Sequence, residues 1–420
     1  MTTFALVDCN NFYVSCERLF RPDLKDKAVA VLSNNDGCIV ARSQEVKDLG
    51  IKTGVPLFQV RQLLEKNHVQ LFSSNYTLYG DISARVMQTL ETFAPNLEIY
   101  SIDEAFLDLN GIGDLPGYAA EIRTTVYRHV GIPVSVGIAP SKTLAKLANY
   151  AAKKYPAANG VVDLSATKRQ QKLLAITPVA EVWGVGHKLN EKLHTAGVTT
   201  ALELSQLDRH RLRCHYPVNL ERTVRELNGE ACIEMEHVPA ARQQIVCSRS
   251  FATRISDHAS LRETICEFTA SAARKLRSDR QHARRINVFI RTSPHTAPHM
   301  GQYYSNSAWG RLAYPTADTF ELIALATRLF DTIYKDGYPY AKAGVMLTDL
   351  HSQDVAQLEM FHPSSATAKH DSLMHAVDTI NATNSGNIWF GGQRARTDWF
   401  MQRDMVSPAY TTNWNCLPTV

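Results

Sequence analysis

The amino-acid sequence predicts a multidomain α/β (α+β) protein, and three observations lead to this class. The chain has 420 residues, and at roughly one to two hundred residues per domain this length favours about three domains. Its first part, up to about residue 160, alternates short apolar runs with longer helical patterns, which is typical of helices layered on a sheet. A helical segment at 165–235 precedes a second region, 243–350, where strand and helix patterns alternate again.

Apolar periodicity and turn residues assign the elements of the first part. Short apolar runs predict strands, and apolar residues that recur at helical spacing predict helices. Asn10 or Asn11 can cap the first helix, and Pro156 with Gly160 ends the last one. The result is a βαββαβ order with a strand at 4–8, a helix at 11–20, a hairpin at 28–43, a helix at 75–93, two strands meeting at a tight connection within 97–109, a helix at 117–130, a strand at 133–139 and a helix at 141–154.

The rest of the chain predicts a small helical unit, a second α/β unit and a tail. Residues 165–235 have helical patterns with short turns, and the break after them lies at 237–242. Three strand-like segments separated by two helical patterns predict the α/β unit over 243–350. Residues 351–420 are rich in Ser, Thr, Asn and Gly. They predict a loosely structured tail that carries short contact motifs.

The composition excludes a wholly disordered chain, because 45% of the residues are hydrophobic, 20% are charged and the net charge is only +4. The first residues lack a basic start followed by an apolar run, and no stretch approaches about 18 uninterrupted apolar residues. We therefore expect a protein that is neither exported nor in a membrane. The eight cysteines form no C-x-x-C pair, so we expect reduced thiols in the cytoplasm.

Three acidic residues mark a candidate metal site. Asp8 ends the first strand, and Asp103 with Glu104 lies at the tight connection within 97–109. The first strand of such a sheet commonly lies centrally, so the three carboxylates can converge, and their repulsion is relieved by divalent cations. Two Mg²⁺ ions at such a site support phosphoryl transfer. The alternative is that Asp8 caps the next helix and the other two are solvated turn residues; each acid alone favours it, but the three together favour the metal site.

Three segments resemble the motifs of Y-family, lesion-bypass DNA polymerases: ALVDCNNFYVSCE at 5–17, SIDEAFLD at 101–108 and VGIAPSKTLAKLAN at 136–149. SNNDGCIVAR at 33–42 and the chain length make the resemblance narrower. The resemblance is most specific to the catalytic subunit of bacterial DNA polymerase V (UmuC type), and it runs from about residue 4 to the end. It implies a right-hand polymerase with a palm at 1–27 and 78–165, fingers at 28–77, a thumb with a helix-hairpin-helix at 166–238, an α/β little finger at 243–350 and a C-terminal tail with a clamp-binding motif at 351–420.

The resemblance also implies roles for the acids. Asp8, Asp103 and Glu104 match the catalytic residues that bind two Mg²⁺ ions, and the backbone carbonyl of Cys9 matches a further ligand. Many relatives carry a second acid where this chain has Asn10, which removes a candidate acid but not a required ligand.

Nucleotide contacts follow from the same resemblance. Tyr13 matches the steric gate that crowds the sugar 2′ position, although a core tyrosine is the alternative. Lys153 matches a triphosphate-binding lysine, whereas the alternative is a solvated lysine at a helix end. Relatives have a Tyr and an Arg where this chain has Gln44 and Lys47, so a phosphate contact of Lys47 lacks the planar two-point geometry of Arg. The backbone amides at a helix N-terminus can hold the triphosphate, and they belong to Asn10, Asn11, Phe12 and Tyr13.

Two regions predict contacts with DNA. Residues 182–198 predict a helix-hairpin-helix in which Gly184 and Gly186 bring backbone amides, with Lys188, close to a phosphate; a plain turn between helices is the alternative. Residues 239–291 hold eleven Lys or Arg and only four Asp or Glu. That surplus suits a polyanion, although a solvated positive face is the alternative.

The tail contains a short peptide that resembles the β sliding clamp motif of bacterial polymerases. Its apolar residues Leu358, Met360 and Phe361 can enter pockets, while Gln357 supplies a polar anchor. The resemblance implies two further partners, a dimer of a self-cleaved accessory subunit (UmuD′ type) and a RecA filament.

Three functions remain open at this point. The first is an error-prone, template-directed DNA polymerase that uses primer-template DNA and deoxynucleoside triphosphates for translesion synthesis. The second is a non-catalytic DNA-binding factor that caps stalled primer termini. A nucleotide cyclase built on the βαββαβ unit is the third, and the predicted DNA-binding regions argue against it.

Overall fold

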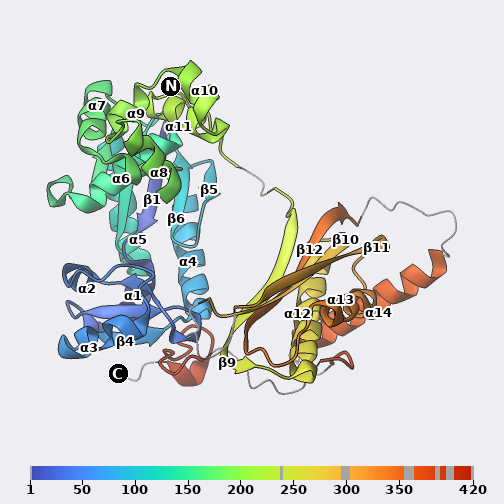
Figure 1. Cartoon of the computed structure of the whole chain (residues 1–420). Coiled ribbons are helices and arrows are strands. Elements are labelled where there is room, and N and C mark those ends of the chain that lie inside the picture. The colour runs from blue at the N-terminus through green and yellow to red at the C-terminus, as the bar shows by residue number, and fades with distance from the viewer. Residues whose placement is uncertain are drawn as a thin grey trace. The chain divides into compact units, whose positions relative to one another are not determined.

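Figure 1 shows the computed structural model, which describes residues 2–236, 240–294, 303–353, 364–383, 388–393 and 402–417. The chain divides into two compact units, which we call the first and the second unit. The first unit comprises Met1–Pro239 together with Arg403–Val420, and the second comprises Ala240–Gln402. The C-terminal end of the chain therefore returns to the unit in which the chain begins.

A five-stranded sheet forms the centre of the first unit. Its strands, in spatial order, are β5 (Leu97–Ile99), β6 (Glu104–Asp108), β1 (Phe4–Cys9), β7 (Val134–Ala139) and β8 (Val161–Asp163). Strand β1 lies in the middle and pairs antiparallel with β6 and β7, which confirms its predicted central position. The two strands expected within 97–109 are confirmed as the antiparallel pair of β5 and β6.

Both faces of this sheet are buried, which explains why β1 is an uninterrupted apolar run rather than an alternating one. Ala5 and Val7 face one core, and Phe4 and Leu6 face the other, since successive side chains of a strand point to opposite sides. The helices of the first core are α1 (Phe12–Leu19), α4 (Tyr76–Glu91) and α5 (Leu115–Val130). Helix α6 (Lys142–Lys154) packs on the other face. The predicted helices are thus confirmed to within a few residues.

The helix caps differ in part from expectation. Asn75 caps α4, because its side chain accepts a hydrogen bond from the Leu78 amide at 3.2 Å. Asn11 stands at the N-cap of α1 in the left-handed conformation and makes no side-chain cap. The side chain of Asn10 instead accepts from the Ser135 hydroxyl at 2.9 Å. The capping prediction is therefore wrong for Asn10 and Asn11, since the sharp turn after β1 directs both side chains elsewhere.

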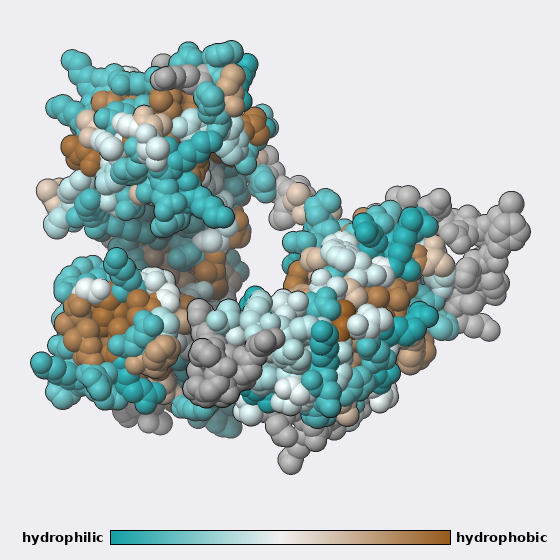
Figure 2. All heavy atoms as spheres, viewed as in Figure 1, coloured by the Kyte–Doolittle hydropathy of each residue, from teal (hydrophilic) through white to brown (hydrophobic). Residues whose placement is uncertain are grey.

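A small three-stranded sheet follows α1. Its strands β2 (Val29–Leu32) and β3 (Ile39–Arg42) confirm the predicted hairpin, although a short 3₁₀ helix joins them. Strand β4 (Gln70–Ser73), which was not predicted, pairs with β2 in parallel. Helices α2 (Gln44–Asp48) and α3 (Leu57–Lys66) complete this part. Figure 2 shows hydrophobic residues at its surface, and Phe58 of α3 is 78% exposed.

A helical subdomain completes the first unit and confirms the predicted helical segment. Its apolar residues share a core with α6 on one face of the central sheet. Its helices are α7 (Thr167–Ile176), α8 (His187–Thr195), α9 (Ala201–Ser205), α10 (Arg209–His215) and α11 (Val218–Leu227).

The second unit is a four-stranded antiparallel sheet covered by helices on one face. Its strands, in spatial order, are β11 (Ser305–Thr316), β10 (Gln281–Thr292), β12 (Tyr340–Ser352) and β9 (Gln244–Ile255). Helices α12 (His258–Ser278) and α13 (Thr319–Ile333) share its core. Edge strand β11 was not predicted, because it is largely exposed and its serines, Gly310 and Pro315 lack the apolar pattern of a core strand.

The predicted loosely structured tail is wrong for much of its length. Strand β12 extends to Ser352, and helix α14 (Ser364–Thr383) belongs to the second unit. Residues 403–417 pack on the first unit, where Ser407 and Tyr410 are buried. The expected clamp motif at 357–361 lies outside the described residues. Within the part that the structure describes, no helix is long and apolar enough to cross a membrane.

Close contact between β7 and α6 depends on Gly137. A Cβ at this position would lie 2.2 Å from the backbone nitrogen of Asn149 and 2.4 Å from the carbonyl oxygen of Ala145. The Asn149 side chain also donates to the carbonyls of Leu6 (3.2 Å) and Ser135 (2.8 Å), which ties α6 to two strands. Because these neighbours are backbone atoms, a larger residue here fits only if the helix itself shifts.

We expect Gly137→Ala to lower the free energy of unfolding by about 1–3 kcal/mol, because the added methyl group forces α6 away from the sheet. Urea unfolding followed by circular dichroism measures the effect. Gly113→Ala is the matched control, since a Cβ there meets nothing within 4 Å. Equal stability of the two variants would contradict the close packing.

Candidate active site

A cavity of about 570 Å³ opens where β1 ends and α1 begins. Its size lies within the range of pockets that hold small organic ligands. Side chains from both the central sheet and the three-stranded sheet line it, and they combine carboxylates, cations and aromatic rings. The lining residues include Asp8, Cys9, Asn11, Phe12, Tyr13, Arg42, Lys47, Thr53, Asp103 and Lys153.

The fold brings the three predicted acids to one edge of the central sheet. Asp8 and Glu104 are direct partners across β1 and β6. The Cys9 amide donates to the Asp103 carbonyl at 2.8 Å, which places Asp103 beside the end of β1. Asp103 lies in the turn before β6, as the tight connection predicted. The predicted convergence of the three acids at one edge therefore agrees with the backbone geometry.

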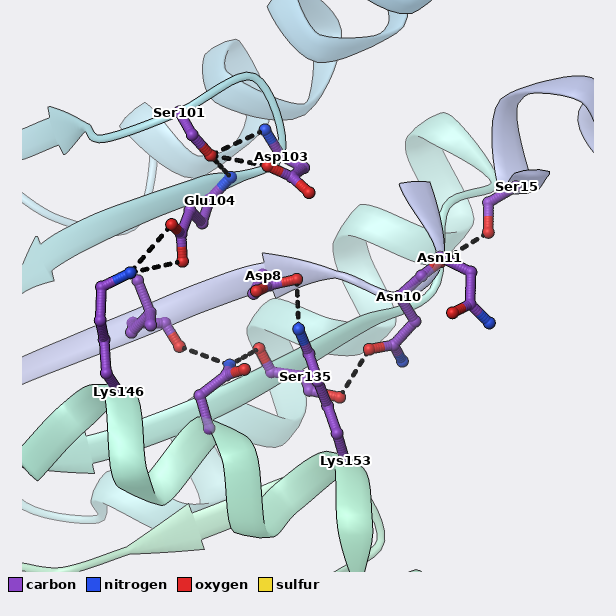
Figure 3. Close-up of polar contacts among 12 residues, drawn as sticks. Asp8, Asn10, Asn11, Ser15, Ser101, Asp103, Glu104, Ser135, Lys146 and Lys153 are labelled. Atoms are coloured by element: carbon purple, nitrogen blue, oxygen red, sulfur yellow. Dashed lines mark hydrogen bonds and ion pairs between the residues drawn. The ribbon is translucent and has the colours of Figure 1, made fainter. Parts of the chain in front are cut away.

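Each of these carboxylates has its own polar partner (Figure 3). Asp8 forms an ion pair with Lys153 at 2.5 Å, and Glu104 accepts two hydrogen bonds from Lys146 at 2.9 and 3.1 Å. Asp103 accepts from the Ser101 hydroxyl at 2.6 Å. Among the described residues, no three His, Cys, Asp or Glu side chains are arranged as a ready metal site. The acids thus share an edge, but their oxygens do not meet at one point.

Lys146 is a functional candidate that sequence reasoning missed. It lies two helical turns before Lys153 on α6, so the seven-residue spacing places both lysines on one face. That spacing is the signal that could have found it. The Lys146 ammonium also lies 4.2 Å from the ring centre of Tyr100 and 5.2 Å from that of Trp183. Lys146 therefore has cation–π contacts with these rings in addition to its ion pair with Glu104.

Burial and like charge make this edge electrostatically costly. Burial raises the pKa of Asp8 to about 6 against the lowering effect of Lys153, and the negative charges of Asp103 and Glu104 raise it further. A carboxylate held among other carboxylates favours cations, and oxygen donors of this kind are those that Mg²⁺ prefers. The donor set therefore fits a divalent cation, provided that the lysines release the carboxylates.

Cys9 is a buried residue of the same strand. The residue is only 3% exposed, and burial together with nearby carboxylates raises the pKa of its thiol. The thiol is therefore held protonated, and any role of Cys9 at the site belongs to its backbone.

In the turn after β1, one backbone amide is already hydrogen-bonded, and the following amides lie at the start of α1. The Asn10 amide donates to the Pro133 carbonyl at 2.8 Å, so it is not available to a phosphate, contrary to the prediction for Asn10. Asn11, Phe12 and Tyr13 lie at the N-terminal end of α1, where helix amides lack partners within the helix. All three line the cavity.

Tyr13 lies on the cavity wall with its ring half-buried. It stacks on the ring of Tyr79 with centres 4.3 Å apart and planes 13° apart. Tyr76 meets it edge-on at 6.2 Å. Tyr13 packs against the first core and also lines the cavity, so it combines features of a core tyrosine with access to the cavity.

Two cations from the three-stranded sheet region also reach the cavity. The Lys47 ammonium donates to the Asn11 side-chain oxygen at 2.6 Å, which joins this region to the start of α1. Burial lowers the pKa of Lys47, and the nearby positive charges of Arg42 and Lys153 lower it further. Arg42, whose guanidinium donates to Thr53, was not singled out in the sequence. An anion among these cations would relieve their repulsion.

The predicted helix-hairpin-helix is supported in part by backbone geometry. Gly184 has φ of +92°, a conformation that favours glycine, and it stands in the turn before α8. Gly186 is the N-cap of α8 in an extended conformation, and a Cβ there would meet nothing. Lys188 is exposed on the first turn of α8. Only Gly184 thus requires glycine for the turn itself.

The open face of the second unit's sheet carries unusually placed cations. Arg285 stands directly opposite Arg311, and Arg291 opposite Lys342. Burial lowers the pKa of Lys342, and the charge of Arg291 lowers it further. Like charges facing each other across strands destabilise a sheet. This arrangement fits a surface that binds a polyanion.

The amino-acid sequence matches two models of one family and a third of unassigned role. Residues 7–150 match the impB/mucB/samB family, and residues 242–360 match the C-terminal domain of that family. Residues 371–420 match a domain of unknown function.

Several known proteins are similar to this chain. Protein UmuC of Salmonella typhimurium is 49% identical over 419 residues, and protein ImpB of the same species is 46% identical over 420, each match covering 99% of both chains. A DNA polymerase IV of Dehalococcoides mccartyi is 28% identical over 89% of this chain and 93% of its own. The structure of a Y-family DNA polymerase chimera superposes with a TM-score of 0.67 at 20% identity, over 83% of this chain and 99% of the chimera. The chain therefore belongs to the impB/mucB/samB family and has the fold of a Y-family DNA polymerase.

Proposed function

We infer that this protein is a DNA-directed DNA polymerase that performs error-prone translesion synthesis by two-metal-ion nucleotidyl transfer, in SOS-type DNA damage tolerance. Its family membership and full-length similarity to UmuC and ImpB support this function. The observation that carries it is local: Asp8 and Asp103 line a cavity, and Glu104 is the cross-strand partner of Asp8. A non-catalytic factor or a cyclase has no comparable support.

The acids are the proposed catalytic and metal-binding residues. Asp8, Asp103 and Glu104, with the carbonyl of Cys9, would hold two Mg²⁺ ions. When bound, such ions activate the attacking primer hydroxyl and stabilise the leaving pyrophosphate. Lys146 pairs with Glu104 and Lys153 pairs with Asp8, and both lysines would give way when metal and nucleotide arrive. The raised pKa of Asp8 supports this role, because it reflects a charge that a cation would stabilise.

The nucleotide is proposed to occupy the cavity at the start of α1. The amides of Asn11, Phe12 and Tyr13 would hold its triphosphate, as helix N-termini bind phosphates. Lys153, once freed from Asp8, and Lys47 would add positive charge. The ring of Tyr13 would stand against the sugar and exclude a 2′-hydroxyl.

The subdomains take the roles that the family resemblance implies. The central sheet with its helices is the proposed palm, the three-stranded sheet region the fingers, the helical subdomain the thumb and the second unit the little finger. Gly184, Gly186 and Lys188 would contact a DNA phosphate, and the cations of the second unit's open face would bind the duplex backbone without reading sequence.

Further partners are proposed from the resemblance. They are a dimer of a self-cleaved accessory subunit of the UmuD′ type, a RecA filament and the β sliding clamp, the last bound through Gln357, Leu358, Met360 and Phe361. The proposed location is the cytoplasm, where these partners and DNA meet.

Asp103→Asn should reduce primer extension by about 10²-fold or more, because loss of one charged metal ligand removes several kcal/mol of transition-state stabilisation. DNA binding, measured by fluorescence anisotropy, should survive. Glu121→Gln, which changes an exposed acid on α5, is the control and should extend normally. Extension by Asp103→Asn at the unchanged rate would remove the metal assignment, and absence of extension by the unaltered protein would favour the non-catalytic alternative.

Replacing Tyr13 by Ala should increase incorporation of ribonucleotides relative to deoxyribonucleotides, because the ring no longer crowds the 2′ position. Single-nucleotide kinetics on a primer-template measures the ratio of the two kcat/KM values. Tyr127→Ala serves as the control, since Tyr127 is 61% exposed on α5. Unchanged sugar selection in Tyr13→Ala would retire the steric-gate role.

Simultaneous replacement of Leu358, Met360 and Phe361 by Ala should abolish stimulation by the sliding clamp, because these residues supply the apolar anchors of the motif. Distributive synthesis without the clamp should be unaffected. Primer extension with and without loaded clamp gives both measurements. Full stimulation of the triple variant would show that the clamp binds elsewhere.

A further inference from the structure

Residues 403–417, which we call the C-terminal segment, are an integral part of the first unit. The Ser73 amide, at the end of β4, donates to the Met405 carbonyl at 3.0 Å, and the Met405 amide donates to the Ser73 hydroxyl at the same distance. The ring of Tyr410 stacks on Phe20 with centres 4.6 Å apart. Tyr410 is only 8% exposed, so the segment is anchored by burial as well as by hydrogen bonds.

The segment is fixed to the start of helix α4. The Asn75 amide group donates to the Ser407 carbonyl at 3.2 Å and to its hydroxyl at 3.0 Å. The oxygen of the same side chain caps α4 through the Leu78 amide. One asparagine therefore sets both the first turn of α4 and the place of Ser407.

The Ser407 side chain also takes part in a buried hydrogen-bond network with side chains of α1 and α4. Glu17 of α1 is fully buried, and one of its carboxyl oxygens accepts from the Ser407 hydroxyl at 3.1 Å and from the Tyr79 hydroxyl at 2.7 Å. The other carboxyl oxygen has no hydrogen-bond partner among the described residues. Burying a carboxyl group costs free energy unless neighbouring groups hydrogen-bond to it. The two hydroxyl donors therefore restrain Glu17, and the hydrogen bond to Glu17 restrains Tyr79.

Tyr79 in turn contacts Tyr13, which lines the cavity. Its ring is fully buried and stacks on that of Tyr13, which lies one helical turn before Glu17 on α1. A continuous chain of contacts therefore runs from Ser407 through Glu17 and Tyr79 to Tyr13.

We propose that Ser407, Glu17 and Tyr79 are positioning residues for Tyr13, so that the C-terminal segment helps to select the sugar of the incoming nucleotide. This inference rests on the proposed role of Tyr13 as the steric gate. The physical reason is that the gate excludes a 2′-hydroxyl only while its ring stays at the wall. The stack on an anchored Tyr79 restricts the ring, and loss of the anchor frees it to turn aside.

The test measures kcat/KM for a deoxyribonucleotide and for its ribonucleotide with the full chain and a primer-template. Ser407→Ala and Tyr79→Phe each remove one hydrogen bond to Glu17 and leave the Tyr13 side chain itself unaltered. Each should lower the discrimination ratio by about threefold to tenfold, which corresponds to the weakening of one aromatic pair. The change should lie in a lower ribonucleotide KM. Because the ratio is taken on one preparation, a partly unfolded variant lowers both values and leaves the ratio unchanged.

Thr412→Ala is the matched control, since it removes an exposed hydroxyl from the same segment, and its ratio should equal that of the unaltered protein. If Tyr13→Ala relaxes sugar selection while Ser407→Ala and Tyr79→Phe keep it, the positioning role is overturned and the steric gate stands. If Tyr13→Ala itself keeps sugar selection, the steric gate fails and this inference fails with it.

Discussion

Repulsion among three carboxylates at one sheet edge is the constraint on which the rest of the first unit depends. Asp8 and Glu104 face each other across β1 and β6, and Asp103 is joined to the same strand through the Cys9 amide. Two lysines from α6 offset this charge. They reach it only because α6 lies against the sheet, where Gly137 leaves room and Asn149 binds two strand carbonyls. The close packing of α6 on the sheet therefore allows the two lysines to reach the acids.

The ion pairs with the lysines explain why the three acids lie near one another but are not arranged as a metal site. Each carboxylate that would bind a cation already has a polar partner, so metal binding must displace two lysines and the Ser101 hydroxyl. Lys146 has aromatic neighbours ready to receive it, and Lys153 borders the cavity in which a triphosphate would lie. Lys153 can thus pair with Asp8 without metal and, once released, would add positive charge to the cavity.

Much of the fold was predictable from the sequence, because the central strands are long apolar runs and the helices have clear periodicity. Strand β11 was missed because an exposed edge strand needs no apolar pattern, and β4 was missed because only two of its four residues, Leu71 and Phe72, are apolar. At the site, Asp8, Asp103 and Tyr13 were predicted where the structure places them. Lys146 was missed although its seven-residue spacing from Lys153 was visible in the sequence. The commitment of the Asn10 amide was missed because it depends on pairing with a distant segment. The role of Ser407 lay beyond sequence reasoning, because nothing in a Ser- and Asn-rich tail indicates where it docks.

We propose that the three carboxylates exchange their lysine and serine partners for divalent metal. Electron paramagnetic resonance of Mn²⁺ bound to the full chain, with primer-template and a non-reactive nucleotide analogue, tests it most directly. The account predicts two bound ions for the unaltered protein and loss of at least one in Asp8→Asn. Undiminished Mn²⁺ binding by Asp8→Asn, or none by the unaltered protein, would contradict it.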